Sequence, residues 1–377
     1  MAESFYQTSQ LINWQQLNQQ ILATKKADIE SIIVQAKSGL GLSLDQFAAL
    51  ISPAAQAYLP QMAQVSQQLT QQRFGKTIQL YIPLYLSNWC SNVCTYCGFS
   101  ANNKVRRNAL TPEQILAEAK AILAKGYQHI LLVTGEMLKK VDTDYLCAAV
   151  KQLRPLFKHI SLEVQPMSVA DYQRLKQAGV DAVLVYQETY DPNTYQNYHL
   201  KGQKADYQHR LKTAERLGQA GMDKIGLGIL LGLRDWRADS LVLAQHLAYL
   251  QKHYWRSRYS LSFPRLRPAL GEISIQNKVS ERDLLQLVCA LRLMFPQVEL
   301  SLSTRERAAF RDLLIPLGIT TMSAESSTQP GGYAEQSAQE LSQFDIDDNR
   351  NTPAICEAIA QQGYQAVMQD WQAEYNR

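Results

Sequence analysis

Eight short apolar segments, each followed by a segment of helical pattern, constrain the fold of this chain more than any other feature. The alternation begins at Thr77 and continues to Ser323. Regular strand–helix alternation is typical of a parallel sheet, and eight repeats close a (β/α)8 barrel. The apolar segments are TIQLYIPLYL, HILLVT, HISLEV, DAVLVY, KIGLGILL, YSLSF, VELSLS and ITTMS. We therefore predict an α/β fold, a parallel (β/α)8 barrel of the TIM type.

The rest of the chain divides around this barrel. Residues 1–72 are rich in Gln and Ala with a helical pattern, which predicts an N-terminal helical extension. Residues 73–323 hold the barrel, and residues 324–377 form a C-terminal extension. The first barrel helix is marked by Thr111–Pro112–Glu113–Gln114, a capping box with proline at the first helical position, and it ends at Gly126.

Charge and hydropathy exclude two broad functions. The net charge is +4, and no Lys/Arg block is interleaved with aromatic residues, so we expect no nucleic-acid binding. No apolar stretch approaches membrane-spanning length, and the segment MAESFYQTSQ lacks the basic and apolar parts of a signal peptide. We expect a cytoplasmic protein that does not bind membranes.

Three cysteines, Cys90, Cys94 and Cys97, follow the first predicted strand with the spacing C-x3-C-x2-C. Full ligation of a [4Fe–4S] cluster takes four cysteines, so three leave one iron open, as in reactive metal sites. The alternative is a zinc site or buried thiols, but zinc usually takes four ligands and neither flank has a nearby His or Cys. With the aromatic Tyr96 before the last cysteine, the motif resembles that of the radical S-adenosylmethionine (SAM) enzymes. This resemblance implies SAM bound at the open iron and cleaved to a 5′-deoxyadenosyl radical.

The other cysteines, Cys147, Cys289 and Cys356, lie in segments of helical periodicity and share no ligand spacing. Free cysteines on such faces usually behave as small buried hydrophobes. We therefore expect one [4Fe–4S] cluster per chain.

Polar residues follow successive predicted strands, where parallel barrels carry their sites. We expect Gly135 and Glu136, after the second strand, near the methionyl ammonium of SAM. We expect Glu163, after the third strand, to accept hydrogen bonds from the ribose, and Tyr96 to contact the adenine. Gly228 in the fifth strand allows close approach of the backbone to the adenosine.

Arginines and a serine follow the sixth and seventh strands: Arg265, Arg267, Ser303 and Arg305. An arginine fork suits bidentate recognition of a carboxylate, which indicates a carboxylate-bearing substrate. Some of these arginines could instead pair only with nearby glutamates.

Longer segments resemble one family within the radical SAM enzymes, the tyrosine lyases of thiamine biosynthesis, also called 2-iminoacetate synthases. They are YIPLYLSNWCSNVCTYCGFS, LLVTGE, EVQPM, VYQETY, HLKGQKADYQHRL, KIGLGILLGL, SFPRLRP, LSTRE and TQPGGY. The resemblance implies cleavage of the Cα–Cβ bond of L-tyrosine to 2-iminoacetate and p-cresol, with 5′-deoxyadenosine and methionine, for the thiazole of thiamine. It also implies a complex with thiazole synthase and an electron donor such as flavodoxin or ferredoxin.

Within this resemblance, Arg305 with Ser303 is our choice for the aminocarboxylate of tyrosine. A base for the phenol is not assigned, although Tyr190, His199 and His209 lie near the expected rim. The tyrosine lyase of hydrogenase maturation carries a second cysteine triplet, and here the C-terminal segment holds only Cys356. Two alternatives stay open: a radical lyase of another aromatic amino acid such as tryptophan, and a non-catalytic interaction module stabilised by a metal.

Overall fold

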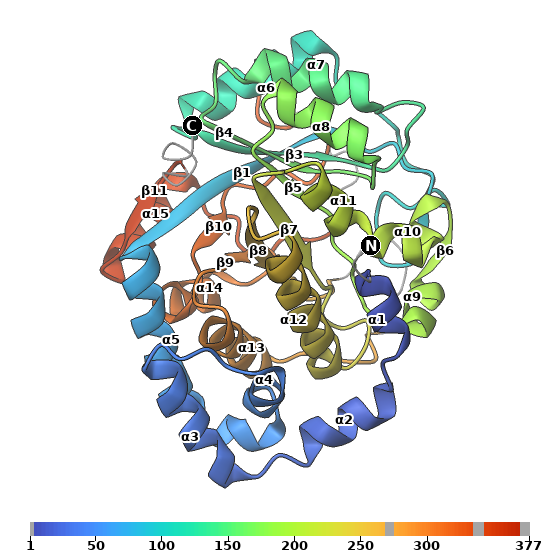
Figure 1. The fold of residues 1–377 in the computed structure, drawn as a ribbon. Helices are drawn as coiled ribbons and strands as arrows, with labels where there is room; N and C mark the ends of the chain where they lie inside the picture. The colour runs from blue at the N-terminus through green and yellow to red at the C-terminus, as the bar shows by residue number, and fades with distance from the viewer. Residues whose placement is uncertain (1–3, 268–274, 335–342, 370–377) are drawn as a thin grey trace.

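Eight parallel strands close into a barrel, as the strand–helix alternation predicts (Figure 1). The computed structural model describes residues 4–267, 275–334 and 343–369. Each strand pairs with its neighbour, and pairing of the last strand with the first completes the ring. The strands are β1 (Thr77–Ser87), β3 (His129–Thr134), β4 (His159–Glu163), β5 (Ala182–Leu184), β7 (Lys224–Gly228), β8 (Arg258–Ser262), β9 (Glu299–Leu302) and β10 (Thr321–Ser323).

Helices connect the strands around the outside of the barrel (Figure 1). The first of them begins with the expected capping box, in which Thr111 and Gln114 bond each other's backbone N–H. The helices that precede successive strands are α6 (Pro112–Ala124), α7 (Thr143–Leu153), α8 (Val169–Ala178), α11 (Thr213–Gln219), α12 (Trp236–His253), α13 (Glu281–Met294) and α14 (Ala308–Leu314).

One connection is more elaborate than the sequence pattern indicates. The helical pattern of the sequence predicts one helix near residues 205–220, followed by Gly221. The structure has two short helices there, α10 (Tyr207–Leu211) and α11, separated by Lys212. They follow α9 (Pro192–Tyr198), the short strand β6 (His199–Lys201) and a 3-10 turn, η2 (Gln203–Ala205). β6 pairs with β2 (Val93–Cys94), which carries one of the clustered cysteines, so this connection reaches the cysteine loop.

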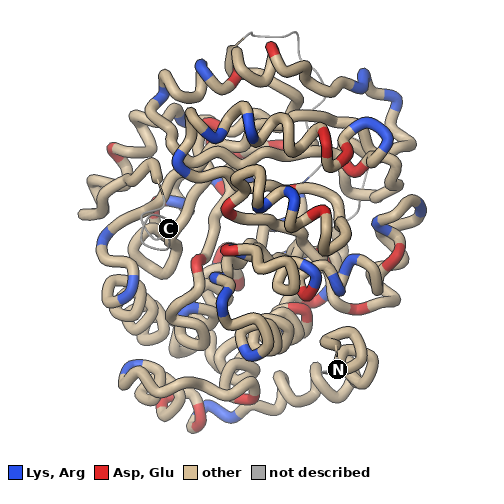
Figure 2. The backbone as a smooth tube through the Cα atoms, turned by 45° about the horizontal axis from the view of Figure 1, so that its top comes forward, with Lys and Arg blue, Asp and Glu red and all other residues tan. Residues whose placement is uncertain are grey.

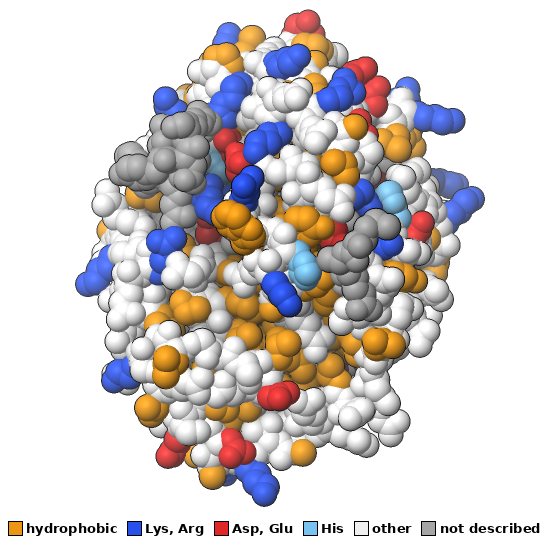
Figure 3. Space-filling view, in the orientation of Figure 1, with side chains coloured by type: hydrophobic (Ala, Val, Ile, Leu, Met, Phe, Trp, Pro, Cys, Tyr) orange, Lys and Arg blue, Asp and Glu red, His pale blue; other side chains and the backbone are white. Residues whose placement is uncertain are grey.

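The segment before the barrel is helical and packs on its outer layer along the lower edge of Figure 1. α5 contacts α13, and both α2 and α4 contact α12. Hydrophobic side chains gather in the middle of this face, where the N-terminal helices meet α12 (Figure 3). The elements are α1 (Phe5–Gln10), α2 (Trp14–Leu22), α3 (Lys26–Lys37), α4 (Leu44–Leu50), η1 (Pro53–Tyr58) and α5 (Leu59–Phe74).

The segment after β10 returns to the barrel. It forms α15 (Thr352–Gln361) and β11 (Gln365–Val367), and β11 pairs in parallel with the start of β1. The end of the expected C-terminal extension, residues 370–377, lies outside the described residues. Lysines and arginines are intermixed with acidic residues along the backbone (Figure 2). Among the described residues, no helix is both long and apolar enough to cross a membrane.

Candidate active site

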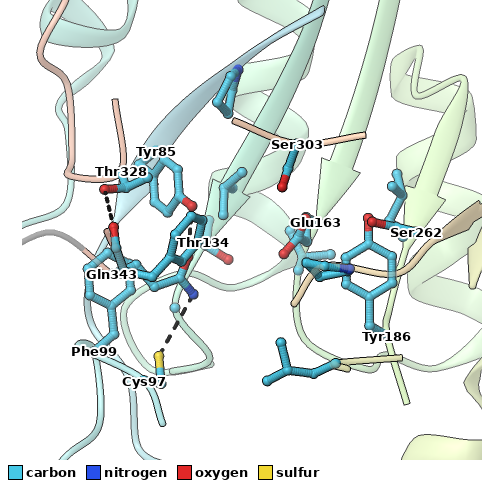
Figure 4. A pocket seen from close by; sticks show the side chains of 18 of the residues that line it. Tyr85, Cys97, Phe99, Thr134, Glu163, Tyr186, Ser262, Ser303, Thr328 and Gln343 are labelled. Carbon is cyan, nitrogen blue, oxygen red and sulfur yellow. Dashed lines mark hydrogen bonds between the residues drawn. The ribbon is translucent and has the colours of Figure 1, made fainter. Parts of the chain in front are cut away.

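A deep cavity opens at the end of the barrel where the parallel strands finish. It contains about 1300 Å³ of space between protein atoms, including solvent at its mouth, which is room for a nucleotide and an amino acid together. Ser303 and Glu163 project into it opposite Tyr85 and Gln343 (Figure 4). Of the residues expected from the sequence, the cavity is lined by Cys90, Cys94, Tyr96, Cys97, Gly135, Glu136, Glu163, Ser303 and Arg305.

The cysteine loop is fixed from two sides. The pairing of β2 with β6 holds Cys94 against the segment around His199. On the other side, the Arg107 guanidinium donates to the backbone oxygens of Asn88 (2.7 Å) and Phe99 (2.8 Å). A loop constrained in this way presents its thiols in one arrangement, as a cluster site requires.

The three thiols fit a cubic iron–sulfur cluster. Burial raises the pKa of Cys97 to about 11 and also raises those of Cys90 and Cys94, so positive iron is needed to hold them as thiolates. Within the described part of the chain, no three His, Cys, Asp or Glu side chains are arranged to hold a single metal ion. A cubic cluster differs from a single ion because each thiolate binds a different iron.

A buried ion pair joins Glu136, just after β3, to α10, and hydrogen bonds join the same glutamate to the cysteine loop. Glu136 accepts from Arg210 (2.9 Å) and from the Asn92 amide (2.8 Å), and its carbonyl accepts from the Ser91 N–H (2.9 Å). Burial alone would raise the pKa of Glu136, but Arg210 and Lys204 hold it below its usual value. Glu136 is therefore a carboxylate at the edge of the cavity, committed on one side to Arg210.

A second ion pair, between Glu188 and Lys204, was not singled out by the sequence. The Lys204 ammonium donates to the Glu188 carboxylate at 2.7 Å, and both residues line the cavity. Glu188 has a φ of 71°, a conformation that non-glycine residues rarely adopt and that concentrates at functional sites. Arg210 and Lys204 lie in HLKGQKADYQHRL, whose spacing alone does not show that both cations turn toward the cysteines.

Tyr96 presents its ring to the cavity, while its hydroxyl is committed elsewhere. The hydroxyl lies 2.8 Å from His199 Nε2, and His199 Nδ1 lies 2.8 Å from the Tyr195 carbonyl. Because a carbonyl only accepts, Nδ1 carries the proton and Nε2 accepts from Tyr96. Burial lowers the pKa of His199 to about 2, so the ring is neutral. His199 thus positions Tyr96, and the ring face of Tyr96 remains for stacking on a ligand.

Two glycines allow close packing at the rim. A Cβ on Gly135 would overlap the Trp89 carbonyl, with the carbonyl carbon 2.9 Å away, so only glycine lets β3 end against the cysteine loop. Gly228 is absent from the residues described as lining the cavity. A Cβ there would lie 2.5 Å from the Tyr186 ring, so this glycine makes room for a side chain that does line it.

Glu163 lies near the centre of the cavity, beside Tyr186 and Ser262 (Figure 4). Burial, reinforced by Glu188 and opposed by Arg305, raises the pKa of Glu163 to about 7. A carboxyl group that titrates near neutrality can donate or accept a proton from a bound ligand.

Arg305 is the cation best placed for a substrate. Its guanidinium carbon lies 3.5 Å from the centre of the Phe344 ring, and the backbone N–H of Arg305 donates to Ser303 Oγ at 3.4 Å. Burial lowers the pKa of Arg305, opposed by the more distant Tyr85, Glu188 and Glu163. Among the described residues, no carboxylate lies within ion-pair distance of its guanidinium, whereas Arg265 and Arg267 have such partners. A buried cation without a counter-ion favours the binding of an anionic group.

The structure does not place Arg265 and Arg267 with Arg305 in the cavity lining. Arg265 grips Glu306 through two nitrogens, with Nε 2.9 Å from one carboxylate oxygen. Arg267 pairs with Asp347 at 2.6 Å. The pairing of Arg265 is one of the glutamate pairings that the sequence left open, and the Asp347 partner of Arg267 was not expected from the sequence.

The remaining candidates for a base are also outside the lining of the cavity. The Tyr190 hydroxyl is 2.9 Å from His246 Nδ1 in the layer below the N-terminal helix, and His209 lies on α10. Three residues that the sequence reading missed, Tyr81, Gln343 and Phe344, do line the cavity. Tyr81 is hidden inside an ordinary apolar strand, and the other two follow the barrel by some twenty residues without a motif of their own.

A parallel barrel with a cysteine triplet at its mouth defines a radical SAM enzyme. The family model described as the Radical SAM superfamily matches residues 84–243, and the Biotin and Thiamin Synthesis associated domain matches residues 262–365. Membership of this superfamily implies a [4Fe–4S] cluster and SAM.

Two relatives identify the family within the radical SAM superfamily to which the chain belongs. The chain is 50% identical over 367 residues to 2-iminoacetate synthase of Escherichia coli (strain K12), covering 97% of this chain and 96% of that protein. It is 48% identical over 367 residues to the enzyme of the same name from Salmonella typhimurium (strain LT2), with the same coverage. The chain belongs to the 2-iminoacetate synthase family.

A solved structure agrees on the fold. The FeFe-hydrogenase maturase HydG from Carboxydothermus hydrogenoformans superposes with a TM-score of 0.89 at 31% identity, covering 98% of this chain and 86% of that one. Methylornithine synthase (PylB) superposes with a TM-score of 0.74 at 19% identity, which shows a common fold.

Proposed function

We propose that this chain cleaves the Cα–Cβ bond of L-tyrosine in the barrel cavity, giving 2-iminoacetate and p-cresol for the thiazole of thiamine. Arg305 carries the proposal: it is a partly buried guanidinium in the cavity with no carboxylate partner among the described residues. The nearby arginines Arg265 and Arg267 each form an ion pair with an acidic side chain. A substrate carboxylate would supply the missing counter-ion.

When bound, the cluster and SAM supply a 5′-deoxyadenosyl radical. Cys90, Cys94 and Cys97 would hold the cluster, with Tyr96 and Glu136 on the adjacent wall for SAM. Glu163 is available to accept a hydrogen bond from the ribose or the substrate amine. The work of the chain is then to hold the amine of tyrosine within reach of the radical carbon and to exclude water, which is mainly a matter of positioning.

The depth of the cavity suggests where the phenol ring lies. Tyr81, Leu131 and Leu184 belong to the middle of the barrel and line both this cavity and a smaller one beneath it. They form an apolar floor with one hydroxyl, that of Tyr81, which lies 3.2 Å from Ser301 Oγ. A tyrosine held by Arg305 at the strand ends would direct its ring toward this floor, and the Tyr81 hydroxyl would meet the phenol.

The positions of the other thiols support one cluster per chain. Cys147 is on α7, Cys289 is fully buried on α13, and Cys356 is on α15. They belong to three separate helices, and none lines the cavity.

Two partners complete the proposal. 2-Iminoacetate is an imine that water hydrolyses, which favours direct transfer to thiazole synthase in a complex. Each turnover also needs electrons at the cluster, from a donor such as flavodoxin or ferredoxin. The support for both is membership of the family, since a reactive product and a low-potential cluster create these needs.

Anaerobic turnover tests the proposal. The protein would be reconstituted with iron and sulfide, reduced, and incubated with SAM and either tyrosine or tryptophan. We expect p-cresol and 5′-deoxyadenosine with tyrosine and no cleaved indole product with tryptophan. Cleavage of tryptophan in place of tyrosine would support the alternative aromatic amino-acid lyase and contradict the role given to Tyr81.

A further inference from the structure

One side chain of the C-terminal extension contacts a cluster cysteine. The Gln343 amide nitrogen lies 3.8 Å from Cys97 Sγ, and the amide oxygen of Gln343 accepts from the Tyr85 hydroxyl at 2.7 Å (Figure 4). A cluster-bound thiolate can only accept a hydrogen bond, whereas the Tyr85 hydroxyl can donate, so with the cluster bound the NH2 group faces the sulfur and the amide oxygen faces Tyr85.

The backbone of Gln343 is held as well. Its carbonyl accepts from the N–H of Gly98, the residue directly after Cys97, at 3.0 Å. Its own N–H donates to the Thr328 carbonyl at 3.1 Å. The amide is therefore positioned by the cysteine loop on one side and by the C-terminal extension on the other, and this exceeds what a space-filling side chain needs.

Phe344, the next residue, contacts the cation proposed to bind the substrate carboxylate. The Phe344 ring lies under the Arg305 guanidinium at 3.5 Å, close enough for a cation–π contact. Adjacent residues thus touch a cluster ligand and the cation proposed for the substrate carboxylate.

We propose that Gln343 is a positioning residue that raises the reduction potential of the cluster, and that Gln343–Phe344 couples tyrosine binding at Arg305 to that potential. The second half rests on the proposed function; the first half does not. An N–H directed at a cluster thiolate stabilises the more negative, reduced state, and such bonds are a recognised determinant of cluster potential. A carboxylate arriving at Arg305 would shift the guanidinium on Phe344 and, through the shared backbone, move the amide relative to Cys97.

The first experiment is a redox titration of the reconstituted holoprotein without SAM or tyrosine, followed by electron paramagnetic resonance. We expect Gln343→Leu to lower the midpoint potential and Gln343→Glu to lower it further, because an anionic oxygen replaces the donor. Tyr85→Phe should lower it in part, since the amide is then free to turn. The control is Tyr333→Phe, which breaks a hydrogen bond between the same extension and Pro83 without contacting Cys97.

An unchanged potential in both Gln343 variants, at the iron content of the wild type, would overturn the role of Gln343. Should Gln343→Leu fail to hold a cluster, Gln343→Met, which keeps the length of the side chain and removes the N–H without adding a charge, decides the question by the same measurement. These readings need no tyrosine cleavage, so they stand even if the proposed function fails.

The second experiment repeats the titration with SAM, with and without tyrosine. We expect tyrosine to shift the potential in the wild type, and Phe344→Leu to lose most of that shift while retaining the potential seen without tyrosine. Absence of a shift in a wild type that binds tyrosine would overturn the coupling, as would a full shift in Phe344→Leu. Failure to bind tyrosine at all would instead count against the proposed function.

Discussion

At the scale of single residues, the three arginines that follow the sixth and seventh strands differ in whether an acidic side chain pairs with them. Arg265, Arg267 and Arg305 look alike in the sequence, because each follows a predicted strand of the barrel. Only the fold shows that Glu306 and Asp347 form ion pairs with Arg265 and Arg267. Arg305 is left facing the cavity, and it is there that a change should affect the substrate and not the cofactors.

Arg305→Lys should weaken tyrosine binding by about tenfold or more, because lysine cannot reproduce a two-pronged pair and hydrogen bonds to charged groups contribute about 1.5–3 kcal/mol each. The cluster and slow tyrosine-independent 5′-deoxyadenosine formation should persist. The measurement is p-cresol yield against tyrosine concentration, with Arg267→Lys as the control. Normal tyrosine dependence in Arg305→Lys would make Arg305 a structural residue of the rim.

Tyr81→Phe should reduce the preference for tyrosine over phenylalanine by about threefold to tenfold, the value of one neutral hydrogen bond. Phenylalanine has no phenol to lose, so its binding should change little. Calorimetric titration of both amino acids into SAM-loaded protein measures the ratio, and Tyr333→Phe serves as the control. A ratio equal to that of the wild type would place the phenol elsewhere.

Glu163→Gln should change how stability depends on pH. Burial raises the pKa of Glu163 from 4.5 to about 7, so the folded protein keeps a proton that the unfolded chain releases. The residue therefore costs stability as pH rises through that window, by up to about 3 kcal/mol above pH 7. Relative to the wild type, the variant should gain free energy of unfolding at pH 8 and not at pH 4.5. Urea unfolding of the cluster-free protein at both values tests this, and a pH-independent difference would contradict it.

At the scale of elements, the barrel was predictable and the connection after β5 was not. The eight strands could be recognised in the sequence because each is apolar and bounded by turn residues. The cysteine loop follows the first of them. The sequence pattern predicts a single helix near residues 205–220 and does not reveal β6, because β6 is only three residues long and gains its partner from the distant β2. The pairing of β6 with β2 brings the segment that carries Lys204 and Arg210 to the cavity. Sequence periodicity does not reveal a pairing between segments so far apart in the chain.

The packing of β3 against the cysteine loop gives the prediction at this scale. Gly135→Ala would push a methyl group into the Trp89 carbonyl and displace the loop. We expect the variant to fold but to incorporate less iron on reconstitution. Gly41→Ala, at a glycine with no atom within 4 Å of the new methyl and no positive φ, is the control. Equal iron content in the two variants would show that the cysteine loop accommodates the methyl group without losing cluster binding.

At the scale of the whole molecule, the two ends of the chain enclose the barrel in different ways. The N-terminal helices pack on the outer layer, and none of their described residues lines the cavity. The C-terminal extension adds β11 beside β1 and returns Gln343 and Phe344 to the cavity. The sequence predicted both extensions, yet nothing in the composition of the second marked it as part of the site. The extension contributes Ser326, Thr328, Gln343 and Phe344 to the lining, and only the folded barrel brings these residues to the cavity.

The final prediction concerns the metal content of the complete chain. With its six cysteines divided between one loop and three separate helices, the reconstituted protein should hold four irons per chain. Cys94→Ala should lose the cluster and turnover, because β2 presents that thiol to the cavity. Cys356→Ala, on a helix distant from the cavity lining, should keep both. Iron and sulfide analysis with p-cresol assays would measure this, and eight irons per chain, or a Cys356→Ala variant inactive with its first cluster intact, would mean that a second centre exists.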